Sequence, residues 1–216
     1  MDKKLFSEII IILDKSGSMY KIRQDTIGGF NQFLEEQKKV SGKANFTLIQ
    51  FDTQYNFVHS GEDIKTVSPL TIHTYIPNGN TALLDAVGRG IIETEQRVNS
   101  MVEKPDQVMF IIITDGEENS SQEFKRERIA EMVKNKQKND KWNFVFLGAN
   151  IDSFAEAGGM GISVSTTADY AINNMRAAYV ATSGKISDYR VSNNASDLNF
   201  TAEDRKNLIQ DDKNKS

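Results

Sequence analysis

Three short segments of this chain are almost entirely apolar, and they constrain its fold more than any other feature. They are residues 8–13, 108–113 and 143–147. A strand with one face in water alternates apolar and polar residues, whereas a strand covered on both faces is a near-continuous apolar run. We therefore predict that these segments are central strands of a parallel sheet with helices on both sides.

Three weaker segments complete the predicted sheet. Residues 45–51 alternate more clearly between apolar and polar side chains, and residues 54–59 follow them almost at once. So short a connection allows only an antiparallel hairpin, because parallel neighbours need a long crossover. We expect this hairpin at one edge of the sheet, and a short sixth strand near residues 162–164.

Helical patterns separate these strands. Apolar residues recur at helical spacing over residues 22–37, 83–98, 124–133 and 168–179. The last stretch predicts a C-terminal helix over about residues 169–183. Strands that alternate with helices indicate a three-layer, doubly wound, Rossmann-like α/β fold with a mostly parallel sheet and an antiparallel edge strand.

The chain divides into a folded unit and a polar extension. We expect one domain over residues 1–185 and an extension over residues 186–216. Within the extension, Thr201 with Asp204 three residues later predicts the start of a short helix over 201–209. The residues after it are polar, and we expect them to be disordered.

Composition excludes several classes of function. The chain has no cysteine and only two histidines, which excludes thiolate metal sites, cysteine nucleophiles and most zinc sites. The net charge is −4 and no basic stripe is present, so we expect no nucleic-acid partner. Apolar runs such as residues 9–13 and 108–113 are far too short to span a membrane, and no secretory signal is visible. We expect a cytoplasmic monomer that does not bind membranes.

Oxygen-bearing side chains gather where the fold predicts a ligand site. Doubly wound sheets bind ligands beyond the carboxyl ends of their strands. The loop after the first strand carries Asp14, Ser16 and Ser18, and the loop after residues 108–113 carries Asp115. Thr81 precedes the second helix. We therefore expect these loops to lie side by side.

Two carboxylates and three hydroxyls match the ligands that Mg²⁺ prefers. Asp14, Ser16 and Ser18 alternate, so their side chains face one way in an extended loop, and Gly17 allows a tight turn between the two serines. The pattern predicts a site for Mg²⁺, or for Mn²⁺ or Ca²⁺.

The pattern Asp14-x-Ser16-x-Ser18, followed by Thr81 and Asp115, resembles the metal-ion-dependent adhesion site (MIDAS) of von Willebrand factor A (vWA) domains. The order of elements agrees over about residues 6–185. The resemblance implies that the two serines and Thr81 contact the ion directly, and the two aspartates directly or through water. It implies an open position for an oxygen of a partner, such as a carboxylate. We expect a metal-dependent protein-binding module and no enzyme.

Two other functions stay open. One is a metal-independent scaffold that assembles through its helical faces. The other is a magnesium-dependent phosphotransferase similar to haloacid dehalogenases, a family that needs a second aspartate where this chain has Ser16. Asp85 is interpreted equally well as support for the site or as part of the helix structure. Glu117, Glu118 and Asn119 flank the site and are interpreted either as selecting the partner or as solvated loop residues.

Overall fold

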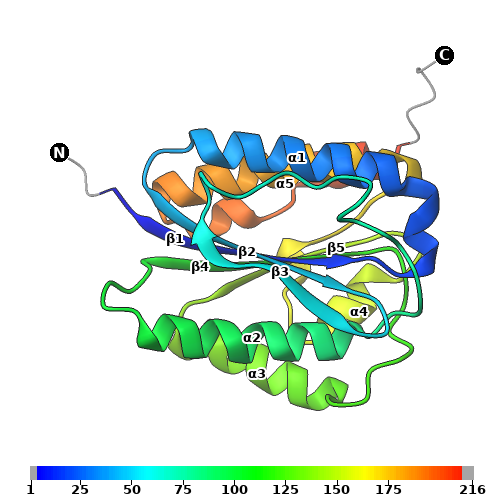
Figure 1. The fold of residues 1–216 in the computed structure, drawn as a ribbon, viewed down its shortest axis with the longest axis horizontal. Helices are drawn as coiled ribbons and strands as arrows, with labels where there is room; N and C mark the ends of the chain where they lie inside the picture. Colours follow the sequence, from blue (N-terminus) through cyan, green and yellow to red (C-terminus); the bar gives the residue numbers. More distant parts are fainter. Residues whose placement is uncertain (1–3, 211–216) are drawn as a thin grey trace.

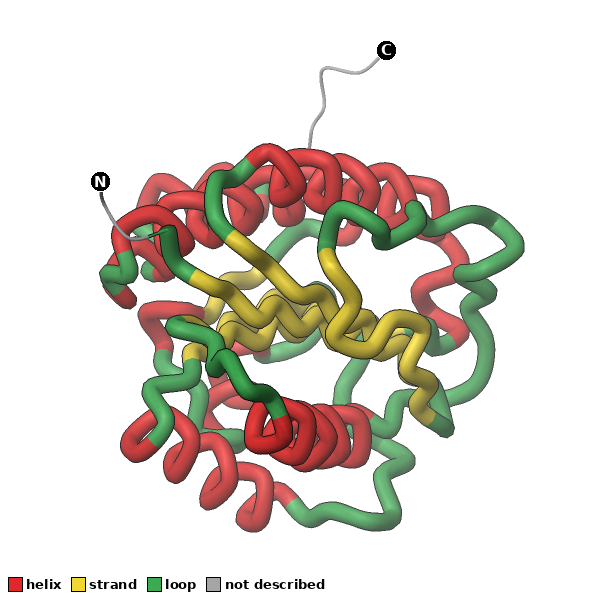
Figure 2. The backbone as a smooth tube through the Cα atoms, turned by 60° about the vertical axis from the view of Figure 1, so that its left-hand side comes forward, coloured by secondary structure: helices red, strands yellow, loops and turns green. Residues whose placement is uncertain are grey.

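A six-stranded sheet forms the middle layer of the molecule, between two layers of helices (Figure 1, Figure 2). The computed structural model describes residues 4–210. The strands are β1 (Phe6–Asp14), β2 (Lys43–Phe51), β3 (Tyr55–Asp63), β4 (Gln107–Thr114), β5 (Asn143–Gly148) and β6 (Thr167–Asp169). Their order in the sheet is β3-β2-β1-β4-β5-β6.

All neighbouring strands are parallel except β2 and β3, which form the antiparallel edge hairpin. The α/β fold class predicted from the sequence is therefore confirmed. The chain builds outward from β1 to one side through β2, and to the other side through β4. The order of the strands thus reverses between β1 and β4, which is where doubly wound sheets place their ligand sites.

The apolar runs are explained by burial on both faces of the sheet. In β1, Ile9, Ile11 and Leu13 enter one hydrophobic cluster, whereas Ile10 and Ile12 enter the cluster on the opposite face. Alternate residues of a strand point to opposite faces, so a strand between two helical layers needs apolar residues at every position. Residues of β4 divide between the two clusters in the same way.

Helices cover the two faces unequally. One face is covered by α1 (Arg23–Lys39) and α5 (Met175–Ser192), the other by α2 (Leu83–Ser100), α3 (Arg126–Asn139) and α4 (Ser153–Gly159) (Figure 1). The last helix, α6 (Ala202–Ile209), contacts β6 and α5. Short 3-10 helices are η1 (Gly17–Ile22), η2 (Val164–Thr166), η3 (Ile172–Asn174) and η4 (Ala195–Leu198). Among the described residues, no helix has the length and apolar character needed to cross a membrane.

The sequence prediction was wrong about the sixth strand. It lies at Thr167–Asp169, beside β5, and not near residues 162–164. Ile162 is instead buried in a turn after α4, where its N–H donates to the carbonyl of Ala157 at 2.9 Å. The strand comes later in the chain than predicted, and α5 accordingly begins at Met175 rather than near residue 169.

The segment after α5 packs against the rest of the molecule. Leu198, Phe200 and Leu208 are buried in the cluster that α1 and α5 share. Thr201 and Asp204 form a reciprocal capping box at the start of α6. The disorder expected after this helix concerns residues 211–216, which lie outside the described residues.

Candidate metal centre

The loops that follow β1 and β4 lie side by side, as the sequence predicted. Leu13 and Ile113 are paired in the parallel register, so the next residues of both strands emerge at the same edge. The Thr114 hydroxyl donates to Asp14 Oδ2 at 2.6 Å and connects the two strand ends. Thr114 was not among the predicted site residues.

Asp14 is the innermost residue of the site. Its side chain is completely buried, and its Oδ1 accepts a 2.6 Å hydrogen bond from the Ser16 N–H. Burial raises the pKa of Asp14 to about 6, although the hydrogen bonds from Thr114 and Ser16 lower it. In the absence of a cation, this carboxylate is therefore poorly stabilised in its ionised form.

A chain of hydroxyls connects the loop after β1 to Asp115. The Oγ atoms of Ser16 and Ser18 are 3.0 Å apart, and Ser18 Oγ donates to Asp115 Oδ1 at 2.5 Å. Asp115 is only 4% exposed, and burial raises its pKa although the Ser18 hydrogen bond lowers it. Four of the five predicted residues, Asp14 included, thus belong to one hydrogen-bonded cluster.

Thr81 approaches the same cluster from the segment before α2. A Cβ atom added to Gly116 would lie 3.0 Å from Thr81 Oγ1 and 3.9 Å from Ser18 Oγ. The absent side chain at position 116 therefore leaves a space that the two hydroxyls border. All five predicted residues converge on this edge of the sheet.

Backbone hydrogen bonds fix the segment before α2 against the loop after β1. The Asn78 N–H donates to the Lys15 carbonyl at 2.8 Å, and the Gly17 N–H donates to the Gly79 carbonyl at 3.0 Å. From the sequence, the glycine needed for a tight turn is expected at Gly17. The left-handed conformation occurs instead at Gly79, with φ of 72°, whereas a Cβ atom at Gly17 would lie 3.4 Å from the Gly79 carbonyl oxygen, an ordinary contact.

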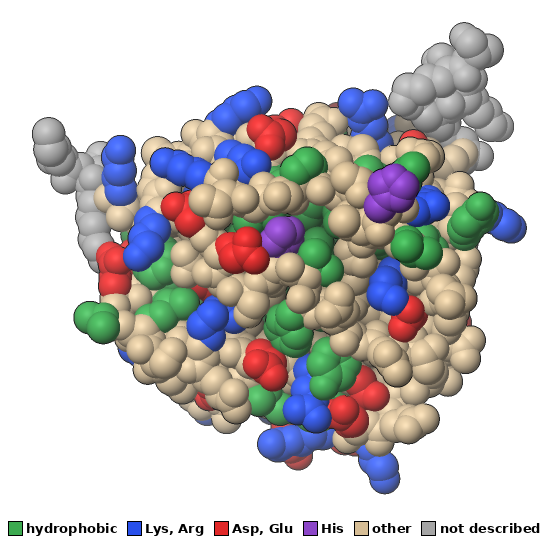
Figure 3. All heavy atoms as spheres, viewed as in Figure 1, with side chains coloured by type: hydrophobic (Ala, Val, Ile, Leu, Met, Phe, Trp, Pro, Cys, Tyr) green, Lys and Arg blue, Asp and Glu red, His purple; other side chains and the backbone are tan. Residues whose placement is uncertain are grey.

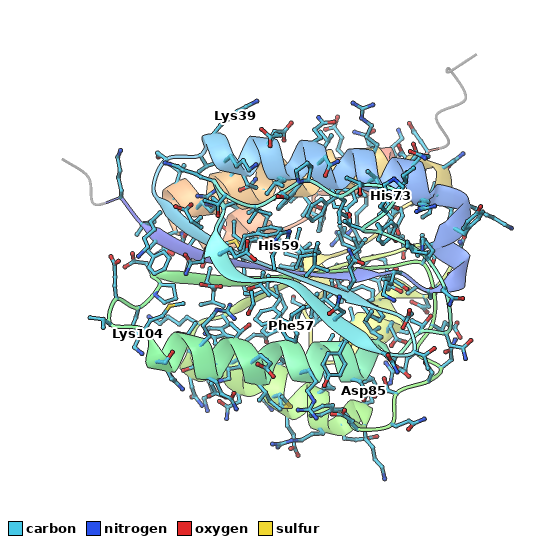
Figure 4. The ribbon with its side chains drawn as sticks, in the orientation of Figure 1. Lys39, Phe57, His59, His73, Asp85 and Lys104 are labelled. Carbon is cyan, nitrogen blue, oxygen red and sulfur yellow. The ribbon has the colours of Figure 1, made fainter. Side chains whose placement is uncertain are left out.

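Asp85, on the first turn of α2, organises the loop that follows Asp115 (Figure 4). Its carboxylate accepts hydrogen bonds from the N–H groups of residues 122, 123 and 124, at 2.8, 3.0 and 2.9 Å. Glu118 acts similarly, because it accepts from the N–H groups of Ser120, Ser121 and Leu84. These two acids tie the loop to the helix that follows Thr81, so they position the site.

Two buried tyrosines donate hydrogen bonds to the backbone of the site, and no pattern in the sequence indicated them. The Tyr75 hydroxyl donates to the carbonyl of Asp14 at 2.6 Å, and the Tyr170 hydroxyl donates to the carbonyl of Thr114 at 3.2 Å. Both bonds hold the last peptide groups of β1 and β4. Tyr75 comes from the segment after β3 and Tyr170 directly follows β6, so only the folded chain brings them here.

The donor set fits a small, hard divalent cation. Neighbouring ligands of an octahedral Mg²⁺ ion are about 3 Å apart, because its bonds to oxygen are about 2.1 Å long. The separation of 3.0 Å between Ser16 Oγ and Ser18 Oγ matches this spacing, whereas Ser18 Oγ and Asp115 Oδ1 are joined by a shorter hydrogen bond of 2.5 Å. Over residues 4–210, no group of three or more histidine, aspartate or glutamate side chains could hold a metal, so any site here depends on hydroxyls.

The two histidines lie on β3 and in the segment that follows it. His59 is on β3 with its Nδ1 3.0 Å from Glu62 Oε1, and His73 is exposed in the segment after β3 (Figure 4). Among the described residues, the hydrogen bonds of the Ser16 and Ser18 hydroxyls and of the Ser16 N–H go to Asp14, to Asp115 and between the two serines, so neither histidine takes the place of a base beside them.

Comparisons with known proteins identify the fold. No family model matches this chain, and no curated protein matches it in sequence. The vWF domain of the type V pili tip protein Mfa5 from Porphyromonas gingivalis is similar with a TM-score of 0.60 and 11% identity, covering 85% of this chain and 96% of that domain. The ArnB paralog VWA2 from Sulfolobus acidocaldarius gives 0.55 and 14%, covering 86% of this chain and 46% of that one.

A third similar structure was determined with a metal. It is proximal thread matrix protein 1 from the mussel byssus with a zinc-occupied MIDAS motif, at a TM-score of 0.55 and 16% identity, covering 90% of this chain and 46% of that one. This chain thus spans about half the length of two of these three structures. At these identities the likeness concerns the fold, and the fold is that of vWA domains.

Proposed function

We propose that this chain is a divalent-metal-dependent protein-binding module. The observation that supports this most is the cluster of carboxylates and hydroxyls at the reversal point of the sheet. Its members, the proposed metal ligands, are Asp14, Ser16, Ser18, Thr81 and Asp115. The vWA fold adds support, since several similar structures are vWA domains.

The residues of the cluster have separate roles in this proposal. Asp14 and Asp115 supply the negative charge, and a nearby cation offsets the burial that raises both of their pKa values. The remaining ligands are neutral hydroxyls, which compensate less of the ion's charge than carboxylates do. A bound divalent ion supplies a positive centre that coordinates a carboxylate oxygen of the partner protein.

We propose Mg²⁺ as the ion, with Mn²⁺ or Ca²⁺ as substitutes. The five ligands offer only oxygen atoms, which suit these hard cations better than zinc, a metal that favours nitrogen and sulfur. The mussel protein was determined with a zinc-occupied MIDAS motif, so zinc belongs among the ions to compare. A comparison of how much of each ion the protein binds at equal concentration distinguishes them.

The test is protein capture with immobilised wild type and Asp14→Ala, each in Mg²⁺ and in chelator. The proposal predicts a partner retained only by wild type with Mg²⁺. A partner retained equally by both proteins, with or without chelator, would support the metal-independent scaffold instead. A circular dichroism melt of each variant checks that the substitution leaves the domain folded.

The same variants test the absence of enzymatic function. We propose that the chain is no enzyme, because the phosphotransferase interpretation needs an acid–base aspartate where Ser16 lies. Magnesium-dependent hydrolysis of p-nitrophenyl phosphate by wild type, abolished in Asp14→Ala, would contradict this part of the proposal.

A further inference from the structure

Three exposed hydrophobic side chains lie on the segments that carry the proposed metal ligands. Large hydrophobic residues are exposed at only eight positions of the described chain, and three of them are Tyr20 at 67%, Ile72 at 47% and Ile76 at 59%. We call these three residues the apolar rim. The other five lie in the loop before β4, in η2, in α5 and in α6: Val102, Val164, Val180, Val191 and Ile209.

The rim is attached directly to the site. Tyr20 lies in η1, two residues after Ser18. Ile76 directly follows Tyr75, whose hydroxyl bonds to the carbonyl of Asp14. The chain then continues to Asn78, whose N–H bonds to the carbonyl of Lys15. Both segments of the rim are therefore fixed to the loop after β1.

Arg23 connects the two segments to each other. Its guanidinium donates to the carbonyl of Tyr75 at 2.8 Å and to the carbonyl of Ile72. The backbone N–H of Arg23 donates to the carbonyl of Tyr20. These bonds hold together the two backbone segments that carry the rim, which reduces the ordering cost of binding. His73 lies between Ile72 and Ile76 in the sequence and is labelled in Figure 4. In the same orientation, Figure 3 shows hydrophobic side chains beside this histidine.

We propose that the apolar rim binds an aliphatic or aromatic side chain of the partner, next to the acidic residue that the metal coordinates. This inference rests on the proposed function and adds the chemistry of the partner: a short segment with an acidic and an apolar residue close together. Apolar patches bordered by polar residues commonly mark interaction surfaces. The exposed Lys21, adjacent to Tyr20, adds a positive charge that suits an acidic segment.

The size of the rim argues for a short segment and against a second copy of this chain. A stable protein interface buries roughly 800 Å² on each partner. Three side chains present far less than this area, whereas one apolar side chain beside a metal-bound carboxylate needs only a small contact.

The test uses random peptides displayed on phage, selected in Mg²⁺ and in chelator. The proteins are wild type, the double variant Tyr20→Ser/Ile76→Ser, and the control Val102→Ser, whose position is fully exposed in the loop before β4. We expect peptides selected by wild type in Mg²⁺ to carry an acidic residue within two positions of an aliphatic or aromatic residue. The control should select the same peptides.

The double variant should still select acidic peptides in Mg²⁺, without the apolar preference, and should bind the wild-type peptides about tenfold more weakly. Its Mg²⁺ affinity, measured by calorimetry, should equal that of wild type. An apolar preference that is absent in wild type, or unchanged in the double variant, would overturn the inference and leave the proposed function intact.

Two other results would also contradict it. If wild type binds no Mg²⁺ and selects no metal-dependent peptide, the proposed function fails and the inference fails with it. If sedimentation shows a dimer of wild type that the double variant abolishes, the rim is an interface between copies of this chain.

Discussion

Asp14 links the charge of the site to the stability of the whole domain. Its pKa in the folded, metal-free protein is about 6, compared with an ordinary value of 3.8. Between these values the folded protein keeps a proton that the unfolded chain has released. The contribution of Asp14 to stability is therefore fully present below about pH 4 and is lost as the pH rises through about 6.

We predict that Asp14→Asn removes this pH dependence. In chelator, wild type should lose up to about 3 kcal/mol more than the variant between pH 4 and pH 7, since the pKa changes by about two units at 1.36 kcal/mol each. Urea unfolding at several pH values measures the difference. Parallel profiles for the two proteins would show that burial does not disturb the ionisation of Asp14.

Asp85 offers a second prediction at the scale of one residue. Asp85→Asn replaces one carboxylate oxygen by an amide NH2, which then faces the N–H of residue 122 at Oδ2 or those of residues 123 and 124 at Oδ1. We expect a loss of about 1–3 kcal/mol in the free energy of unfolding, the usual cost of an unsatisfied buried donor. Mg²⁺ affinity should also fall, because the same loop carries Asp115.

Glu123→Gln is the matched control for Asp85→Asn. Glu123 lies in the same loop and pairs with Arg89 at the exposed surface, where an ion pair contributes little. Equal losses of stability in the two variants would show that the loop needs its charges and not the backbone bonds to Asp85.

At the scale of elements, the contact between α1 and α5 depends on one glycine. A Cβ atom at Gly29 would lie 2.4 Å from the ring of Tyr179, which is 1% exposed and cannot move into solvent. A Cβ atom at the neighbouring Gly28 would have no atom within 4 Å. Alanine substitutions at these two adjacent positions therefore distinguish the effect of packing on stability from the effect of helix propensity.

We predict that Gly29→Ala lowers the free energy of unfolding by about 1–3 kcal/mol through overpacking. Gly28→Ala should raise it by about 0.5–1 kcal/mol, since alanine favours a helix over glycine. Thermal melts of both variants make the comparison. A stabilised Gly29→Ala variant would mean that α5 can shift away from α1 at little cost.

The central strands could be predicted because a strand that is buried on both faces needs apolar residues at nearly every position. Residues 8–13 and 108–113 lie within β1 and β4, and the hairpin follows from a connection too short for a crossover. The prediction missed α4, a helix of seven residues that ends in two glycines. It misplaced β6, whose three residues pair only with β5 and are too few to show a period.

The candidate site was predictable only in part, for a related reason. Asp14, Ser16 and Ser18 are neighbours in the chain, and the strand order brings Asp115 beside them. Tyr75, by contrast, reaches Asp14 from a segment 61 residues away. Contacts of this kind depend on the packing of loops, which no local periodicity encodes.

At the scale of the whole molecule, the segment after α5 completes the hydrophobic core. Leu208 is 1% exposed, and its carbonyl accepts hydrogen bonds from the Ala171 N–H and the Asn174 side chain. The adjacent Ile209 is 58% exposed. α6 therefore packs against the rest of the domain, next to β6, through Leu208, whereas Ile209 faces solvent.

We predict that Leu208→Ala costs about 2–4 kcal/mol of stability, as expected for a buried leucine. Ile209→Ala should change stability by less than about 0.5 kcal/mol. Denaturant unfolding of the two variants tests this, and equal, small effects would show that the final helix is separable from the domain.

The most direct test of the account is a calorimetric titration of wild type and Asp14→Ala with Mg²⁺, with a thermal melt of each protein. We predict one bound ion for wild type, none for the variant, and a cooperative melt for both. A folded wild-type protein that binds no ion, or a variant that binds Mg²⁺ as tightly as wild type, would contradict the proposal that this cluster is a metal site.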